Sequence, residues 1–317
     1  MQYKISLLII SFFAFQFCTN AQNWQRQEEG FGNLPESIQV FKSTDSIEGL
    51  PNIAYYVKVN IRDKKLKIST DTTDGRRLTP LQAIIVMNTT FFSFETNRNL
   101  GMVMNDGDML AYSVHNSFQK SDSTYRYLLP GTFGINKKRN ADIAWVFTDS
   151  TKKVPRAWQS YAMPLKGVSK YKAGNFKTIK SVALRSAGKG KKWRMQMAVA
   201  GGPVLLQNGE VAVYNNEENK FAGKAINDRH PRTAIGYTSD GYMILMVVEG
   251  RRQGVAAGVT LTQLANMFKN LGCVEALNLD GGGSSCLLIN SVETIKPSDK
   301  EGKQRPVPGV LLVSSMN

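Results

Sequence analysis

A loop of three consecutive glycines is the feature that most constrains how this chain can fold. It lies within residues 278–285, which read Asn-Leu-Asp-Gly-Gly-Gly-Ser-Ser. Polar and apolar residues alternate before it, and a short apolar run follows it at 286–289, so the pattern predicts a strand, a loop and a second strand. Glycines can adopt positive φ and carry no side chain, so their N–H groups can converge on an anion. Asp280 then stands at a strand end beside an anion-receptive loop.

Most of the remaining chain shows the patterns of short β-strands. Residues 55–61 alternate between apolar and polar side chains, whereas 83–87 and 242–248 are continuously apolar, as in buried strands. A single helix is clear from residue 261 onward: its apolar residues recur at helical spacing, Thr260 and Gln263 form a capping box, and a glycine follows its end. The sequence therefore predicts an α+β fold, one sheet-dominated domain with mixed or antiparallel strands and few helices.

The first 21 residues have the pattern of a cleaved export signal. A positive start at Lys4 precedes an apolar block, and small residues stand before the predicted cut. Lipid modification of Cys18 is the weaker alternative, because a bulky phenylalanine precedes it. An uncleaved membrane anchor is also disfavoured, since the block is short for a span. The prediction is a protein outside the cytoplasm, periplasmic or secreted, with a lead-in at 22–45 and one domain at 46–317.

The net charge of the chain indicates which class of binding partner to expect. The chain has 40 Lys and Arg against 25 Asp and Glu, a net charge of +15, which predicts an anionic neighbour. Phosphate-bearing glycan or an anionic envelope surface is favoured over nucleic acid, because the basic residues are scattered with few aromatic residues between them.

Without the export signal, Cys273 and Cys286 are the two cysteines that remain in the chain. Their apolar contexts favour two buried thiols, although they flank the glycine loop and could pair.

Several familiar active sites are poorly supported by the sequence. His115 and His230 are the only two histidines, so a multi-histidine zinc site is not available. A Gly-x-Ser-x-Gly nucleophile motif around Ser284 fails, because Cys286 occupies its last position. The glycine loop also lacks the spacing of nucleotide- and dinucleotide-binding loops.

Polar residues that end apolar strands are the remaining candidates for chemistry. If those strand ends converge, two carboxylates and two guanidiniums share one pocket. Arginine binds phosphate oxygens bidentately, and a carboxylate pair is what glycoside hydrolysis uses. Taken singly, each arginine could be a surface ion pair, and each carboxylate or amide could satisfy its own turn. The candidates are Asn88, Arg232, Glu249, Arg251 and Asp280.

Five segments, in this order, resemble the phosphodiester glycosidase family. The resemblance covers roughly residues 80–315, including the helix and the tail that begins Arg305-Pro306. This chain departs from the family pattern at Thr90, where glycine is usual, and at Glu249, where aspartate is usual. The segments are Asn88-Thr89-Thr90-Phe91-Phe92, Gly201-Gly202-Pro203-Val204-Leu205, Arg232-Thr233-Ala234-Ile235-Gly236, Val248-Glu249-Gly250-Arg251 and the glycine-loop octapeptide.

The resemblance implies a glycosidase that hydrolyses a sugar 1-phosphodiester at the anomeric C–O bond. Arg232 and Arg251 are then expected to hold the phosphate, with Asp280 and Glu249 as nucleophile or base. No cofactor is required, although calcium on acidic oxygen ligands is compatible with such a site. The remaining residues expected to bind or position the substrate are Asn88, Thr233, Asn278, Gly281, Gly282, Gly283 and Ser284.

Two other functions stay open at this point. The same carboxylates could be metal ligands in a phosphodiesterase that cleaves the P–O bond. Alternatively, the basic surface could belong to a non-catalytic envelope protein that binds anionic glycan.

Overall fold

The computed structural model describes residues 22–27, 29–73, 81–119, 123–161, 165–167, 190–222, 226–299 and 302–316. The predicted export signal at 1–21 lies outside them. No helix within these ranges is long and apolar enough to cross a membrane.

The largest sheet has eight strands and is antiparallel throughout its described pairs. The segment 22–45, expected to be a lead-in, contributes its first two strands, and Ile38 and Val40 of the second are buried. The order across the sheet is β1 (Gln25–Arg26), β2 (Ile38–Ser43), β3 (Ala54–Asn60), β19 (Tyr242–Val248), β18 (Arg232–Thr238), β20 (Cys273–Asn278), β16 (Val204–Gln207) and β17 (Glu210–Val211).

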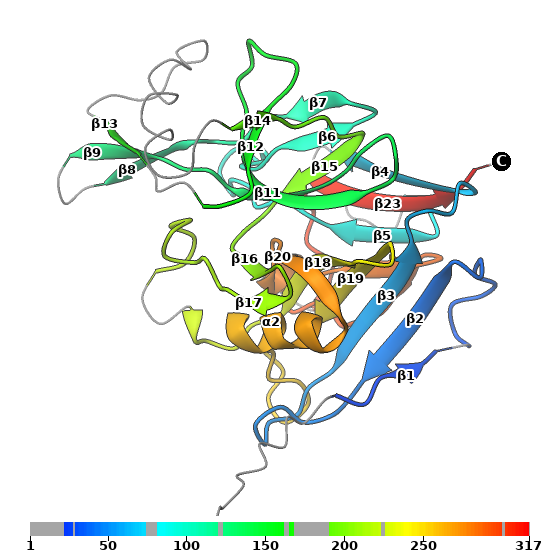
Figure 1. Ribbon diagram of the computed structural model, residues 1–317. Helices are drawn as coiled ribbons and strands as arrows, with labels where there is room; N and C mark the ends of the chain where they lie inside the picture. The colour runs from blue at the N-terminus through cyan, green and yellow to red at the C-terminus, as the bar shows by residue number, and fades with distance from the viewer. Residues whose placement is uncertain are drawn as a thin grey trace, which may run out of the picture.

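Three further sheets lie on one side of the eight-stranded sheet (Figure 1). The seven-stranded sheet runs β14 (Lys191–Lys192), β12 (Arg156–Trp158), β11 (Ala141–Phe147), β10 (Gly131–Ile135), β15 (Met197–Ala200), β6 (Val103–Asn105), β7 (Asp108–Ala111). The five-stranded sheet runs β22 (Val292–Glu293), β21 (Leu287–Ile289), β5 (Ile85–Asn88), β23 (Gly309–Ser315), β4 (Leu66–Thr72). The smallest runs β13 (Leu165–Gly167), β9 (Thr124–Tyr127), β8 (Asn116–Gln119). Strands β12 and β13 fall in 148–180, where prolines and glycines interrupt the strand pattern of the sequence.

Helix α2 (Leu261–Asn270) covers the opposite face of the eight-stranded sheet (Figure 1). Its capping box is formed as predicted: Thr260 accepts from the Gln263 N–H, and the Gln263 side chain accepts from the Thr260 N–H. Its apolar face packs on β16, β17 and β20, and Phe268 lies against Gly236 of β18. It is the one α-helix among the described residues, so the prediction of a sheet-dominated α+β fold is confirmed.

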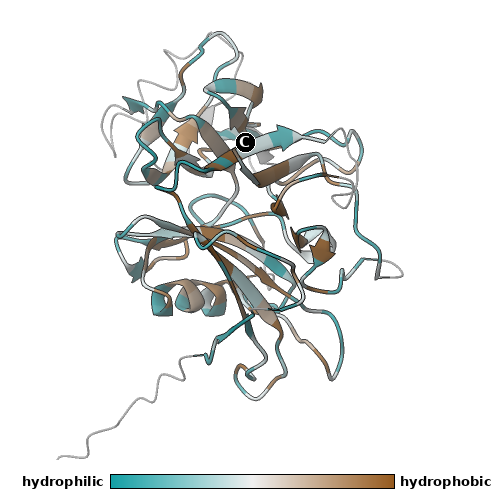
Figure 2. Cartoon of the chain, turned by 90° about the vertical axis from the view of Figure 1, so that its right-hand side faces the viewer, coloured by the Kyte–Doolittle hydropathy of each residue, from teal (hydrophilic) through white to brown (hydrophobic). Residues whose placement is uncertain are grey.

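Apolar side chains fill the space between the sheets. The larger hydrophobic cluster contains Phe133, Trp145 and Phe147, all buried, with aliphatic residues from the facing strands. Figure 2 shows the hydrophobic colour concentrated on interior strands and the hydrophilic colour on loops and on the outer face of the helix. Cys273 and Cys286 are both buried free thiols, as the sequence favoured. Burial raises the pKa of each to about 12.

Antiparallel pairing brings three strand ends to one edge. Because β18 lies between β19 and β20, its first residue is opposite Val248, the last residue of β19, while Ala234 pairs with Asn278 at the end of β20. The end of β5 joins the same edge, since the Asp280 N–H donates to Thr89 O at 2.8 Å. The fold therefore gathers the polar residues that follow these strands.

Candidate active site

A pocket of about 340 Å³ lies at this edge; we call it the arginine pocket. It brings together seven of the residues predicted from the sequence and adds five aromatic or basic residues. The predicted ones are Arg232, Arg251, Asn278, Asp280, Gly281, Gly282 and Gly283. The added ones are Phe91, Phe94, Phe221, His230 and Arg305.

The glycine loop needs its three glycines for different reasons. Residues Gly282–Ser284 form a 3-10 turn, and Gly282 alone of the three has a positive φ, +62°. A Cβ on Gly281 would lie 2.9 Å from the Pro231 carbonyl oxygen, and one on Gly283 would lie 2.4 Å from Nη2 of Arg305. The absence of a side chain at Gly281 and Gly283 therefore lets the loop approach the Pro231 backbone and the Arg305 guanidinium closely.

Asp280 is the one carboxylate that lines the arginine pocket. Burial raises the pKa of its side chain to about 6, while a hydrogen bond from Ser284, the charge of Arg305 and a hydrogen bond from the Gly281 N–H lower it. Desolvation disfavours the charged carboxylate, and the three partners stabilise it only in part. A carboxyl with such a pKa can exchange a proton near neutral pH, which suits a nucleophile or base.

Arg305 supports Asp280 from the C-terminal tail. Its Nε donates to Oδ2 of Asp299 at 2.7 Å, and its Nη1 donates to Oγ of Ser284 at 3.3 Å. Its guanidinium carbon lies 5.1 Å from the ring centroid of Phe94. Ser284 itself is buried, so it positions the Asp280 carboxylate instead of lining the pocket.

The other two guanidiniums come from neighbouring strand ends. Arg232 is 3% exposed and donates to the carbonyls of Val259 and Asp228, both at 3.1 Å. Burial and the charge of Arg251 lower the pKa of Arg232 to about 10, which leaves it charged at neutral pH. Arg251 is exposed, has a φ of +60°, and lies 3.5 Å from Nδ1 of His230. Burial and the two arginines lower the pKa of His230, so this imidazole is neutral at pH 7.

Asn88 and Thr233 lie behind the pocket wall. Both are buried, and the Thr233 hydroxyl donates to Oδ1 of Asn88 at 2.9 Å. The same Oδ1 accepts from the Cys286 N–H at 3.0 Å, while Nδ2 of Asn88 donates to Asp280 O at 2.6 Å. The sequence predicted substrate contacts for these two residues, but the structure assigns them to holding both ends of the glycine loop.

Asn278 lines the pocket with an unused acceptor. Its Nδ2 donates to the carbonyls of Gly202 and Leu279, both at 2.9 Å. The residue is 1% exposed, and its Oδ1 is buried without a hydrogen-bond partner. A buried acceptor without a partner is costly, so this atom is suited to a donor supplied by a ligand.

Glu249 does not lie where the sequence placed it. It is 3% exposed and is not among the residues that line the arginine pocket. One carboxylate oxygen is paired with Arg252, and the other accepts from the Lys296 N–H at 2.9 Å. Both oxygens are therefore engaged within the protein. This carboxylate ties the turn that carries Arg251 to the segment that leads to Arg305.

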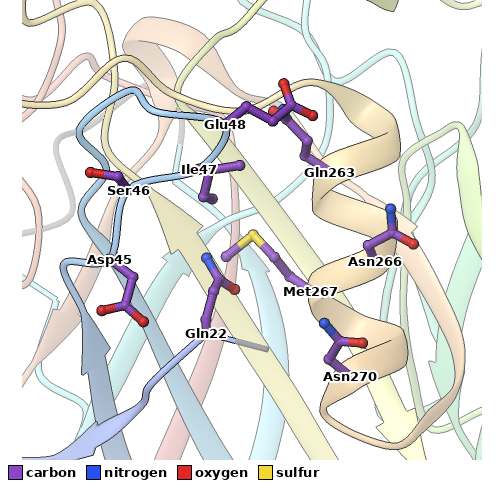
Figure 3. A pocket seen from close by; sticks show the side chains of 9 residues that line it. All are labelled: Gln22, Asp45, Ser46, Ile47, Glu48, Gln263, Asn266, Met267 and Asn270. Atoms are coloured by element: carbon purple, nitrogen blue, oxygen red, sulfur yellow. The ribbon is translucent and has the colours of Figure 1, made fainter. Parts of the chain in front are cut away.

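A larger cavity, of about 500 Å³, has the opposite chemistry (Figure 3). It lies between α2 and the loop 45–48, with Gln22 between them. Its charged lining residues are Asp45 and Glu48, and its other polar residues are amides and a serine. Carboxylates repel phosphate, so the arginine pocket is the better candidate for an anionic ligand.

The fold and the pocket together define a β-rich domain with an anion site built around one carboxylate. Residues 81–314 match the family model described as phosphodiester glycosidase. The chain belongs to the phosphodiester glycosidase family.

Two relatives matched by sequence illustrate the extent of this similarity. The mouse N-acetylglucosamine-1-phosphodiester alpha-N-acetylglucosaminidase is 29% identical over 103 residues, which are 30% of this chain and 20% of that protein. The SPbeta prophage-derived uncharacterized protein YomE of Bacillus subtilis is 37% identical over 89 residues, which are 28% of this chain and 13% of that protein. The alignments thus span a fifth or less of these relatives.

Two solved structures share the fold at low sequence identity. The catalytic domain of the zebrafish N-acetylglucosamine-1-phosphodiester alpha-N-acetylglucosaminidase, auto-inhibited by its pro-peptide, has a TM-score of 0.58 and 18% identity, covering 92% of this chain and 88% of that one. A hypothetical protein from Synechocystis has a TM-score of 0.61 and 16% identity, covering 94% of this chain and 64% of that one.

Proposed function

We propose that this protein is an exported glycosidase that hydrolyses a sugar 1-phosphodiester at the anomeric C–O bond. Family membership supports the reaction class. The observation that carries the proposal is the arginine pocket itself, in which three guanidiniums line the same cavity as one carboxylate whose pKa is about 6. Guanidiniums match phosphate oxygens, and the carboxylate is placed to act on a carbon beside them.

In this scheme Asp280 acts at the anomeric carbon as nucleophile or as base for water. Arg232, Arg251 and Arg305 bind the phosphate and stabilise the charge that develops on it as the C–O bond breaks. A phosphate monoester is a weak base, so the leaving group needs little help from a general acid. Oδ1 of Asn278 accepts a hydrogen bond from a sugar hydroxyl or amide. Glu249 is a positioning residue that acts through the arginine-bearing segments.

The scheme needs no cofactor. Calcium prefers six to eight oxygen ligands, several of them carboxylates. In the arginine pocket it would meet one carboxylate and three guanidiniums, so this donor set does not fit the ion. Within the described ranges, no group of three or more His, Cys, Asp or Glu side chains is arranged to hold a metal ion.

Export and the nature of the glycan rest on the sequence. The pattern of residues 1–21 supports export, and the net charge of +15 supports contact with phosphate-bearing glycans of an envelope or its surroundings. A positive surface raises the local concentration of such an anionic substrate.

Release of free sugar from a panel of sugar 1-phosphodiesters tests the proposal. N-acetylglucosamine, glucose and galactose 1-phosphates, each as a simple alkyl diester in both anomers, should include at least one substrate. Hydrolysis in ¹⁸O-labelled water identifies the cleaved bond, read in the phosphate product by ³¹P NMR because phosphate oxygens do not exchange with water. We expect phosphate without label and turnover that survives a chelator.

Two results would contradict this reaction. Label in the phosphate, together with loss of turnover in the chelator, would indicate metal-assisted cleavage of the P–O bond. Binding of these diesters without turnover of any of them would indicate a protein that only binds anionic glycan.

The pH dependence of kcat/KM provides a separate prediction. Asp280 must be ionised to act as nucleophile or base, and its pKa is about 6. We expect kcat/KM to be constant above pH 7 and to fall about tenfold for each pH unit below 6. The substrate phosphodiester does not titrate in this range, so the fall in kcat/KM at low pH reports the ionisation of a group on the enzyme. Circular dichroism at pH 5 controls for unfolding; a flat profile from pH 5 to 8 would exclude this role for Asp280.

A further inference from the structure

A second pocket, of about 330 Å³, adjoins the arginine pocket; we call it the side pocket. The two pockets share Phe91 and Phe221, whose ring centroids lie 6.0 Å apart. The Nζ of Lys220 lies 5.1 Å from the Phe91 centroid, and the guanidinium carbon of Arg232 lies 5.8 Å from the Phe221 centroid. Two aromatic rings therefore form the boundary between the pockets. A ligand bound to the arginines can extend past them into the side pocket.

Apolar groups dominate the lining of the side pocket. Leu100 and Val114 contribute side chains that are 40% and 51% exposed, and Leu128, Pro130 and Ala200 complete much of the wall. The exposed residues are held as one continuous surface, because the Leu100 N–H donates to Phe91 O and the Val114 N–H donates to Leu100 O, both at 2.8 Å. Exposed apolar residues are ordinary singly, but gathered at a pocket they mark a site for an apolar ligand.

The two charged residues of the side pocket carry opposite charges. Lys220 and Glu218 line the same wall. Glu218 is buried and accepts from the N–H groups of Gly131 and Val204 and from the Trp145 indole N–H, at 2.8–3.2 Å. One ammonium beside one carboxylate adds no net charge. The side pocket therefore differs from the arginine pocket and offers little to a second phosphate.

We propose that the side pocket binds the alcohol half of the phosphodiester and that this alcohol is an aliphatic chain. The inference rests on the proposed function: the arginine pocket holds the sugar and phosphate, and the remaining ester bond leads past Phe91 and Phe221. It narrows the substrate to a sugar joined through phosphate to a lipid-like alcohol. Burial of the chain against Leu100 and Val114 supplies binding energy that a short or hydrophilic alcohol lacks.

Esters of one sugar 1-phosphate with methanol, octanol and the 6-hydroxyl of glucose test this assignment. We expect kcat/KM for the octyl ester to exceed the other two by at least about tenfold, since each methylene removed from water contributes a factor of about four. Val114→Asp should abolish the octyl preference, so that in this variant kcat/KM for the octyl ester lies within about twofold of that for the methyl ester. Val292→Asp is the matched control, because Val292 is 44% exposed and lines neither pocket.

The outcomes separate this inference from the proposed function. Turnover of the methyl or glucose ester at least equal to that of the octyl ester would overturn the side-pocket assignment and leave the glycosidase intact. If no ester is turned over, calorimetry with octyl phosphate and methyl phosphate still decides. If octyl phosphate binds at least tenfold more tightly than methyl phosphate and Val114→Asp removes this difference, the assignment is supported. Equal affinities of the two phosphates would contradict it.

Discussion

Replacing Asp280 with asparagine should lower kcat/KM by a factor on the order of 10³ or more while making the folded protein more stable at pH 8. Loss of turnover is expected because asparagine is neither a nucleophile nor a base at the anomeric carbon. The phosphate ligands remain, so binding of the diester should persist. Sugar release and calorimetric titration of the variant measure the two effects separately.

The stability gain follows from the raised pKa of Asp280. Its folded value, about 6, exceeds the ordinary aspartate value of 3.8, so ionisation is harder in the folded protein than in the unfolded chain. The stabilising effect of the neutral acid is complete below pH 3.8 and is lost as pH rises through 6. Relative to wild type, the asparagine variant should gain about 2 kcal/mol of unfolding free energy at pH 8, after allowance for solvent screening, and almost nothing at pH 4.

Urea unfolding at pH 4, 6 and 8 measures this difference. Asp63→Asn is a control of opposite sign. Hydrogen bonding at this carboxylate, including the bond that the Lys65 N–H donates to Oδ1 at 2.9 Å, lowers the pKa of Asp63, so its replacement should cost stability at pH 8. A stability difference for Asp280→Asn that does not change with pH would show that the carboxyl does not titrate as described. Full activity in the variant would remove Asp280 from the reaction.

The elements that the sequence predicts well are those encoded by neighbouring residues. The capping box of α2 needs only Thr260 and Gln263, three positions apart, and the alternation at 55–61 marks β3 without reference to other strands. The gathering of strand ends was also predictable, since buried antiparallel neighbours share an edge. Strand β2 was missed because Ile38 and Val40 are its only buried apolar residues and the surrounding segment is polar.

The site residues that the sequence misplaced depend on contacts between distant segments. Glu249 follows β19 directly, but the turn at Arg251, with its φ of +60°, and a bond to the Lys296 N–H decide where its carboxylate lies. Asn88 ends a buried strand and was expected to face a ligand, yet a backbone group on each side of the glycine loop uses its amide. Neither arrangement has a local sequence pattern.

Arg305 and the aromatic residues were missed for a related reason. Arg305 lies 25 positions after Asp280 and reaches the pocket because Asp299 and Ser284 hold its guanidinium. The tail containing Arg305 lay within the family resemblance, which was the one available signal. Phe91 and Phe94 are loop residues, and nothing in their spacing indicates that they border a pocket.

Replacing Arg232 with lysine should lower kcat/KM by a factor on the order of 10² and also destabilise the protein. The planar guanidinium donates to two carbonyls with Nε and Nη2 and lines the pocket, which a lysine ammonium cannot do in the same geometry. The carbonyls of Val259 and Asp228 lose these donors, which should cost about 1–3 kcal/mol of unfolding free energy. Most of the kinetic loss should be in transition-state stabilisation, since the phosphate gains charge as the bond breaks.

Arg229→Lys separates the two effects, because Arg229 has similar backbone partners outside the pocket. It donates to the carbonyls of Gly258 and Ile47, both at 3.1 Å, and is not among the pocket-lining residues. Its replacement should lower stability to a similar extent and leave kcat/KM nearly unchanged when assayed well below the unfolding temperature. Equal kinetic losses in the two variants would attribute the effect of Arg232→Lys to folding. A loss confined to Arg232→Lys supports a direct role for this guanidinium in holding the phosphate.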